Sequence, residues 1–134
     1  MRLTTRSEYA LLALIHLGRR SDDVDCQPVQ AIARSEGMPP KFLEQILLIL
    51  KRARYVRSRR GKHGGYHLAR PASRISLAEI VRLMDGPLAP TDSASKHFYG
   101  PTPIERERKL LRVFREIRDH VSDKLESTTI ADVS

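Results

Sequence analysis

The chain has 134 residues, 40% of them apolar, and a single cysteine, which fits one domain, or one domain with an appended element, and excludes an intrachain disulfide. No apolar run approaches the roughly 20 residues of a membrane span, and the N-terminus lacks the apolar core of a signal peptide, so we expect a cytoplasmic protein. The net charge of +8 lies in residues 1–70, which have 14 Lys/Arg and 6 Asp/Glu, whereas residues 71–134 have 10 of each and are neutral. This asymmetry is typical of a protein that binds a polyanion with one end, although a basic surface can also be merely solvated.

The first predicted helix opens with the sequence TRSE at residues 5–8. Thr5 and Glu8 have the spacing of a capping box, in which each side chain accepts a hydrogen bond from the other residue's backbone amide. The residues that follow, YALLALIHLG, are apolar almost all round, which predicts burial on more than one side. Gly18 is expected to end the helix in a left-handed conformation, and RRSDDVDCQ to form a loop.

Two shorter helices predict a helix-turn-helix. Pro28 suits the first position of a helix over PVQAIARSE, and Gly37 would end that helix. Pro39 and Pro40 open the next helix, KFLEQILLILKRA. Two helices separated by the short segment GMPP form a candidate helix-turn-helix motif.

The second of these helices has two faces. At about 100° per residue, one side is apolar and predicts the surface that packs on the core (Phe42, Leu43, Ile46, Leu47 and Leu50). The opposite side is a largely polar stripe that predicts contact with DNA, although such a stripe is also the ordinary solvated side of a core helix. The stripe consists of Lys41, Gln45, Leu48 and Arg52, with Glu44 at its edge.

Seven Lys or Arg and no acidic residue lie between Lys51 and Lys62. The segments YVRSRR and YHLAR alternate as short strands do, and GKHGG between them supplies the positive-φ residues of a hairpin reversal. After a helix-turn-helix such a hairpin is the wing of a winged helix, in which Gly64 and Gly65 would allow close backbone approach to a minor groove. A basic hairpin can alternatively be a sheet edge protected from aggregation by charge. The side chains expected at the tip are Arg59, Arg60, Lys62 and His63.

The second half contains two further capping boxes. SLAE from Ser76 and TPIE from Thr102 predict helices that begin near Leu77 and Pro103, the latter roughly 24 residues and about 36 Å long. An apolar stripe along this long helix needs a partner, and we expect a second copy of the chain rather than the chain's own small N-terminal domain. The stripe consists of Leu110, Phe114, Ile117, Val121 and Leu125. The predicted fold class is mainly α with a small β-hairpin: a winged helix-turn-helix plus a long C-terminal dimerisation helix.

The segments MRLTTRSEYALLAL, FLEQIL, RGKHGGYHLARP, ISLAEIVRLMDGPLAP and STTIADV follow one another over nearly the whole chain. In this order and spacing the chain resembles the bacterial IscR/NsrR/CymR-type transcription regulators. The resemblance implies dimers that bind pseudo-palindromic operators. It matches Glu44 and Gln45 to the family's Y-L-E-Q motif in the recognition helix and Arg60 to its R-G-x-G-G-G wing. We divide the chain accordingly into a DNA-binding domain (1–86), an effector or linker loop (87–102), and a dimerisation helix with a tail (103–134).

The loop before the long helix departs from part of that family. Members that bind an iron–sulfur cluster have three cysteines there, because thiolates stabilise such clusters, and this loop has none. Asp92, Ser93, His97, Tyr99 and Glu105 are too hard or too weakly basic to hold a cluster. We therefore predict no metal site and no cofactor.

Cys26 lies outside that loop, shortly after the first helix. A single thiol can be oxidised, but acidic neighbours oppose a lowered pKa, and we interpret it as incidental. His16, His67 and His120 fall on helix or strand positions and are interpreted as packed or solvated side chains.

The sequence predicts no enzyme, because it has no glycine-rich phosphate loop and no serine in a nucleophile-elbow context. We expect a sequence-specific DNA-binding transcription regulator, a repressor that acts as a homodimer on a pseudo-palindromic operator without an iron–sulfur cluster. The sequence leaves its effector open among a small molecule, a protein partner, a thiol oxidant and none. The alternative is a winged-helix interaction module whose basic wing binds an acidic protein or RNA.

Overall fold

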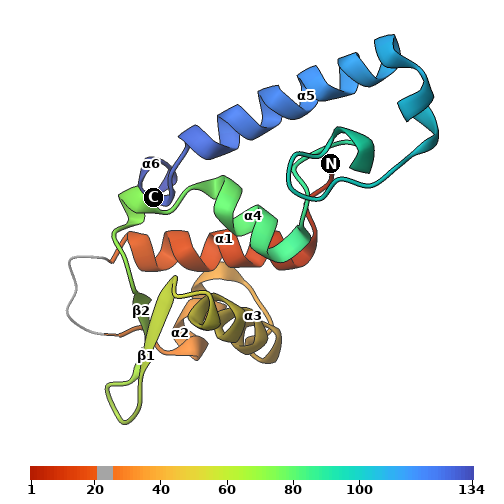
Figure 1. The fold of residues 1–134 in the computed structure, drawn as a ribbon. Coiled ribbons are helices and arrows are strands. Elements are labelled where there is room, and N and C mark those ends of the chain that lie inside the picture. The colour runs from red at the N-terminus through yellow and green to blue at the C-terminus, as the bar shows by residue number, and fades with distance from the viewer. Residues whose placement is uncertain (21–25) are drawn as a thin grey trace.

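The computed structural model describes residues 1–20 and 26–134, and these residues form six α-helices and one antiparallel hairpin (Figure 1). The predicted fold class is confirmed: the chain is mainly helical, with a winged helix-turn-helix and a long C-terminal helix. In chain order the elements are α1 (Thr5–Gly18), α2 (Val29–Glu36), α3 (Pro40–Arg52), β1 (Val56–Arg59), β2 (Gly65–Leu68), α4 (Leu77–Asp85), α5 (Arg108–Ser127) and α6 (Ile130–Val133). Most of the loop predicted after the first helix, residues 21–25, lies outside the described residues.

The residue that caps the start of helix α1 lies one position before the one that the sequence predicted. The N-cap is Thr4, whose hydroxyl accepts a hydrogen bond from the Ser7 amide at 3.3 Å. Thr4 also donates through its backbone amide to Asp85 at 3.1 Å, which ties the start of α1 to the end of α4. The Thr5 capping box is therefore wrong, since Thr5 is already the first helical residue.

Gly18 does not end α1 in the left-handed conformation that the sequence predicted. The following residue, Arg19, caps the helix in the right-handed region at φ −66°. A Cβ atom at Gly18 would lie 2.8 Å from the Ser134 side chain and 3.3 Å from that of Ile130. The absence of a side chain at Gly18 leaves room for the C-terminal α6, which packs on the end of α1.

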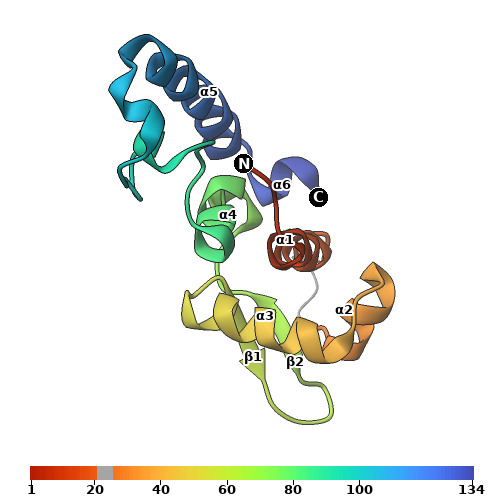
Figure 2. The same cartoon turned by 90° about the vertical axis from the view of Figure 1, so that its right-hand side faces the viewer.

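Helix α1 lies in the middle of the molecule, with α4 on one side and α2, α3 and the hairpin on the other (Figures 1 and 2). This position explains why its sequence is apolar almost all round, as predicted. Its Leu14 packs with Ile32 of α2 and with Leu43, Ile46, Leu47 and Leu50 of α3 in one buried core. Two predicted ends of the helix-turn-helix are confirmed, since Gly37 is left-handed and α3 begins at Pro40. Pro28 is the N-cap of α2 rather than its first helical residue, which is Val29.

The hairpin pairs β1 with β2 in antiparallel register, from Val56 opposite Leu68 to Arg59 opposite Gly65. Gln27 pairs with the other edge of β2 through two backbone hydrogen bonds with Tyr66, each 2.8 Å long. A Cβ atom at Gly65 would lie 2.3 Å from the Gln27 carbonyl oxygen, and one at Gly64 equally close to the Arg59 carbonyl oxygen. These two glycines therefore serve the protein's own backbone packing, whereas the sequence analysis assigned them to the approach of a groove.

The two capping boxes predicted in the second half have different outcomes. Ser76 and Glu79 cap α4 reciprocally, as expected. The Thr102 box is wrong: Pro103–Arg106 form only a short 3₁₀ turn, and α5 begins at Arg108 after Glu107. The Thr102 hydroxyl bonds the side chains of Thr91 and Ser93 instead, so it is not free to cap a helix. The long helix consequently has 20 residues rather than the 24 expected.

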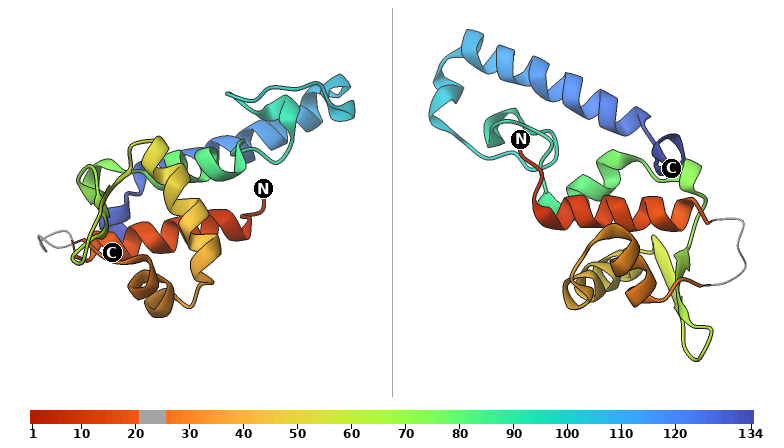
Figure 3. Two further views of the ribbon diagram at one scale, coloured as in Figure 1. Left: turned by 90° about the horizontal axis from the view of Figure 1, so that it is seen from below. Right: turned by 180° about the vertical axis from the view of Figure 1, so that it is seen from behind.

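The C-terminal segment returns to the N-terminal domain. The amide of Leu77 donates to the Thr128 carbonyl at 2.9 Å, and the amide of Ile130 donates to the Ile75 carbonyl at 2.8 Å. Ile130 is fully buried in the same core as α1 and α3. The ribbon shows α5 extending away from this anchor along one side of the molecule (Figure 3).

Candidate nucleic-acid interface

The recognition helix α3 separates its two faces as its sequence predicted. Leu43, Ile46, Leu47 and Leu50 are buried, and Phe42 is partly buried. The predicted stripe is exposed along the whole helix: Lys41, Glu44, Gln45, Leu48 and Arg52 all face solvent. The burial of one face thus fixes the polar side chains on the other.

The tip of the wing presents the predicted basic side chains. Arg59 ends β1, and Arg60, Lys62 and His63 occupy the turn, where all four are exposed. The turn is closed by a backbone hydrogen bond from the Gly64 amide to the Gly61 carbonyl at 3.0 Å. Gly61 and Gly65 supply the positive φ angles, +104° and +139°.

The α3 stripe and the wing tip lie at the same end of the molecule, and α5 lies at the opposite end (Figures 1 and 2). Burial and, secondarily, the Glu44 carboxylate of α3 raise the pKa of the Tyr66 phenol in β2. The elements that hold the eight exposed residues predicted for DNA contact, α3 and the wing, thus lie at one end of the molecule, which we call the basic end.

A hollow of about 620 Å³, not predicted from the sequence, lies where the end of α3, the turn after it, β1 and the residues that follow β2 meet. We call it the cationic hollow; its lining consists of Lys51, Arg54, Val56, Arg57, Ser58, Ala69 and Arg70. Its basic residues were visible in the sequence as part of the run from Lys51 to Lys62. No sequence signal separated them from the helix stripe and the wing tip, because their grouping depends on the turn between α3 and β1.

One side of the cationic hollow is braced by a small polar network. The Arg70 guanidinium lies 4.5 Å from the centroid of the Tyr55 ring and 3.8 Å from the Glu79 carboxylate. The Tyr55 hydroxyl donates to Glu79 at 3.1 Å. Burial, then the Glu79 carboxylate, raise the pKa of Tyr55. For Glu79, burial acts to raise the pKa, but hydrogen bonds from Ser76 and Tyr55 and the Arg70 charge outweigh it and lower that pKa.

The predicted apolar stripe of α5 divides into two parts. Leu110 and Ile117 are each 43% exposed, and Val113, which the sequence analysis did not include, is 49% exposed. Phe114, Val121 and Leu125 are partly buried within the chain, and Leu125 packs against Ala78, Val81 and Leu88. The unpartnered part of α5 is thus the face formed by Leu110, Val113 and Ile117, here called the α5 face.

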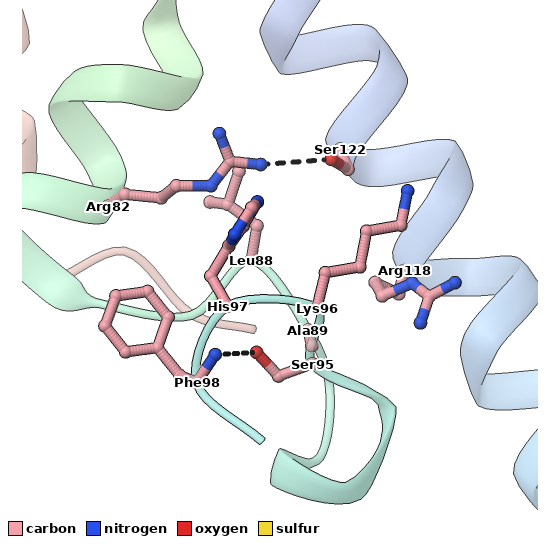
Figure 4. Close-up of a pocket in the computed structure, with 9 residues that line it drawn as sticks. All are labelled: Arg82, Leu88, Ala89, Ser95, Lys96, His97, Phe98, Arg118 and Ser122. Carbon is pink, nitrogen blue, oxygen red and sulfur yellow. Dashed lines mark hydrogen bonds between the residues drawn. The ribbon is translucent and has the colours of Figure 1, made fainter.

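The loop of residues 87–102 is held between α4 and α5. Arg118 donates to the Ala94 carbonyl at 2.7 Å, and Arg82 donates to Ser122 at 3.2 Å and to Glu126 at 2.6 Å. A pocket of about 10 Å³ remains between these elements (Figure 4), which is room for about one water molecule. Its lining consists of Arg82, Leu88, Ala89, Ser95, Lys96, His97, Phe98, Arg118 and Ser122.

Comparison with known proteins identifies the family. Residues 3–134 match the Rrf2 family, described as "Iron-dependent Transcriptional regulator". The chain belongs to the Rrf2 family. Its members among the relatives are named as transcriptional regulators and not as enzymes, which confirms the prediction that this chain is not an enzyme.

Two relatives cover the whole chain. Rv1287 of Mycobacterium tuberculosis, a candidate HTH-type transcriptional regulator, is 38% identical over 137 residues, which span 100% of this chain and 81% of that protein. The HTH-type transcriptional regulator CymR of Bacillus subtilis is 29% identical over 134 residues, spanning 100% of this chain and 90% of that protein.

Solved structures agree with this assignment. The structure of CymR, the global cysteine regulator of B. subtilis, has a TM-score of 0.78 at 28% identity and covers 99% of this chain and 95% of that one. The structure of T. potens IscR has a TM-score of 0.76 at 25% identity, and the match covers 99% of this chain and 85% of that one. The resemblance seen in the sequence is therefore confirmed.

The family description raises the question of iron, and the donor atoms of this chain do not fit a cysteine-held cluster. A cluster of this kind needs several thiolates, and Cys26 is the single cysteine. Within residues 1–20 and 26–134, no group of three or more His, Cys, Asp or Glu side chains is placed to hold a metal ion.

Cys26 itself is buried at the base of the wing. Its Sγ lies 3.3 Å from Nδ1 of His67 in β2. The other histidines behave as packed or solvated side chains: His16 is buried with Nδ1 3.3 Å from Glu36, and His120 is exposed on α5. The interpretation of Cys26 as incidental stays a prediction.

Proposed function

We propose that this Rrf2-family regulator is a repressor that binds a pseudo-palindromic operator as a homodimer and does not use an iron–sulfur cluster. The observation that carries the proposal is the basic end, where the exposed stripe of α3 and the wing tip project from one side of the molecule. An α-helix fits the major groove of DNA, and a narrow basic tip fits the adjacent minor groove.

The proposed contacts fall into two classes. Gln45 and Glu44 lie near the start of α3 and have the hydrogen-bonding groups that distinguish bases, a Gln amide for adenine and a carboxylate for cytosine. Lys41, Arg52, Arg59, Lys62 and His63 are assigned to backbone contacts, and Arg60 to the minor groove.

The proposed dimer uses the α5 face. Leu110, Val113 and Ile117 follow one another at three- and four-residue spacing, so they form one stripe on the helix, and each is more than two-fifths exposed. Burying such a stripe against a second copy removes it from water and relates two basic ends by a two-fold axis. Symmetry of the operator follows from that of the dimer.

We keep the proposed division of the chain into residues 1–86, 87–102 and 103–134, with residues 128–134 of the last segment anchored in the first. The loop of residues 87–102 is the proposed effector region because it contacts both α4 and α5. Since the pocket beneath it holds about one water molecule, a small-molecule effector would have to open it. A protein effector would instead bind the outer surface of the loop.

We also propose a cytoplasmic location, as a DNA-binding regulator of bacterial genes requires. None of the helices in the described part of the chain is long and apolar enough to cross a membrane.

Selection of duplexes from a random DNA library tests the proposed function. The purified protein is expected to enrich an inverted repeat, and footprinting is expected to show protection on both half-sites. Enrichment of no duplex, with retention of structured RNA or acidic protein instead, would replace the proposal with that of an interaction module.

A further inference from the structure

We propose that the cationic hollow holds the sugar–phosphate strand that separates the two DNA grooves contacted by α3 and the wing. The inference rests on the proposed function and adds three phosphate-binding residues, Lys51, Arg54 and Arg57. None of the three belongs to the residues predicted for DNA contact from the sequence.

The position of the hollow is the first argument. Lys51 comes from the last turn of α3, Arg54 from the connecting turn, and Arg57 from β1, and α3 contacts β1 directly. Adjacent major and minor grooves are separated by one sugar–phosphate strand. If α3 occupies one groove and the wing tip the other, that strand passes between the two elements, which is where the hollow lies.

The charge of the hollow is the second argument. Four of its seven lining residues are Lys or Arg and none is acidic. Lys51, Arg54 and Arg57 are exposed, and among residues 1–20 and 26–134 no carboxylate lies within 4.0 Å of their charged groups, whereas Arg70 is paired with Glu79. Three cations therefore face a concave surface with the chemistry that phosphates bind.

The backbone of Arg54 is the third argument. Its φ is +67°, the one positive value at a non-glycine residue in the described chain. It stands at the left-handed position of a Schellman motif, in which the Arg54 amide donates to Lys51 and the Tyr55 amide donates to Leu50. Glycine is the favoured residue at this position, because a side chain there is sterically costly. An arginine at a position where glycine would be less strained points to a use for its side chain.

The carbonyl groups at the end of α3 carry the negative end of the helix dipole, but four of them already accept a hydrogen bond within the chain. Those of Ile49, Leu50 and Lys51 accept hydrogen bonds from the backbone amides of residues 53–55, and the Arg54 carbonyl accepts one from the Arg70 guanidinium at 3.3 Å. Each of these carbonyls thus has one of its two lone pairs engaged, and the three cations beside them outweigh the partial negative charge that remains.

Salt-dependent binding tests the three residues. A duplex selected by the wild-type protein, and a scrambled duplex, are titrated by fluorescence anisotropy between 50 and 300 mM NaCl with Lys51→Gln, Arg54→Gly and Arg57→Gln. Each variant is expected to bind both duplexes about tenfold more weakly and to reduce the slope of log K against log salt by about 2 for a dimer, which loses two phosphate contacts. Arg112→Gln, which removes one charge from an exposed position on α5, is the matched control. It is expected to change neither the affinity for the two duplexes nor the slope of log K against log salt.

Arg54→Gly separates binding from folding. Because glycine relieves the left-handed strain, its thermal midpoint is expected to equal or exceed that of the wild type while its DNA affinity falls. Arg54→Lys is expected to recover most of the affinity, since it restores the charge.

Neutral methylphosphonate linkages identify the DNA strand involved. They are placed one at a time along the selected duplex. At one or two linkages in each half-site, on the strand between the contacted grooves, they are expected to abolish the difference in DNA affinity between the wild type and the three variants. The proposal is overturned if the wild type binds the duplex but the variants bind no more weakly than Arg112→Gln. It is also overturned if no single neutral linkage removes the difference in affinity between the wild type and the variants. A wild-type protein that selects no duplex would instead refute the proposed function, and the hollow's role with it.

Discussion

The amide of Ile130 donates to the carbonyl of Ile75 at 2.8 Å, and with this bond the C-terminal segment joins the core of the N-terminal domain. Ile130 is fully buried, so the proposed dimer helix and the basic end are connected by packed structure at the end of α5. A change in the orientation of α5 is therefore expected to reach α1 and α4.

Ile130→Ala is expected to lower the free energy of unfolding by about 2–5 kcal/mol, because it leaves a cavity in the shared core. Ile130→Val is expected to cost about 0.5–1.5 kcal/mol. Urea denaturation followed by circular dichroism measures both. Equal stability of the Ala variant and the wild type would mean that the tail is not part of the folded core.

Ile117→Asp is expected to convert the proposed dimer into a monomer at micromolar concentration, because it places a charge in the apolar α5 face. Sedimentation velocity measures the change. Glu116→Gln, at a neighbouring exposed position, is the control and is expected to remain a dimer. Leu125→Ala should instead lower stability, since Leu125 packs within the chain; a monomeric wild type would contradict the proposal.

Gln45→Ala is expected to relax discrimination among operator bases, whereas Arg60→Ala is expected to weaken binding by roughly 1–3 kcal/mol through the loss of its minor-groove contact. Competition assays with single-base operator variants distinguish the two effects. Equal losses on every sequence for both variants would remove Gln45 from the base-contacting residues.

Glu79→Gln is expected to lower stability at neutral pH by at most about 1 kcal/mol, since the side chain is partly exposed. The pKa of Glu79 is lowered in the folded state, so its carboxylate stabilises the fold above the unfolded pKa, and this contribution is lost as the pH falls through the folded value. The free energies of unfolding of the wild type and the variant should therefore converge in acid, once the pH falls below the lowered folded pKa of Glu79. A difference in the free energy of unfolding that stays constant between pH 3 and pH 7 would show that the charge of Glu79 does not cause the loss of stability.

Anaerobic treatment with iron and sulfide is expected to produce no stoichiometric visible absorption, and DNA affinity is expected to be unchanged by it. The reason is that one cysteine per chain cannot supply the thiolates of a cluster. A stoichiometric chromophore whose removal alters operator affinity would contradict the cluster-free proposal.

The sequence predicted those parts of the fold that short-range chemistry determines. The ends of α2 and α3 follow from Pro28, Gly37 and Pro40, and the Ser76 capping box locates α4, because each of these signals acts over a few residues. The two faces of α3 followed from helical periodicity for the same reason.

The errors arose where distant segments compete for a residue. Thr102 has the spacing of a helix cap, but its hydroxyl bonds Thr91 and Ser93. Gly18 has the position of a helix stop, but α6 packs against it. The cationic hollow was missed because the left-handed turn at Arg54 has no glycine to reveal it.

The dependence of operator affinity on salt concentration tests the central claim most directly. If a dimer neutralises at least about 8 phosphates with its basic end, the slope of log K against log salt for the selected duplex should be about −7 or steeper. A slope near zero would contradict DNA binding through this surface.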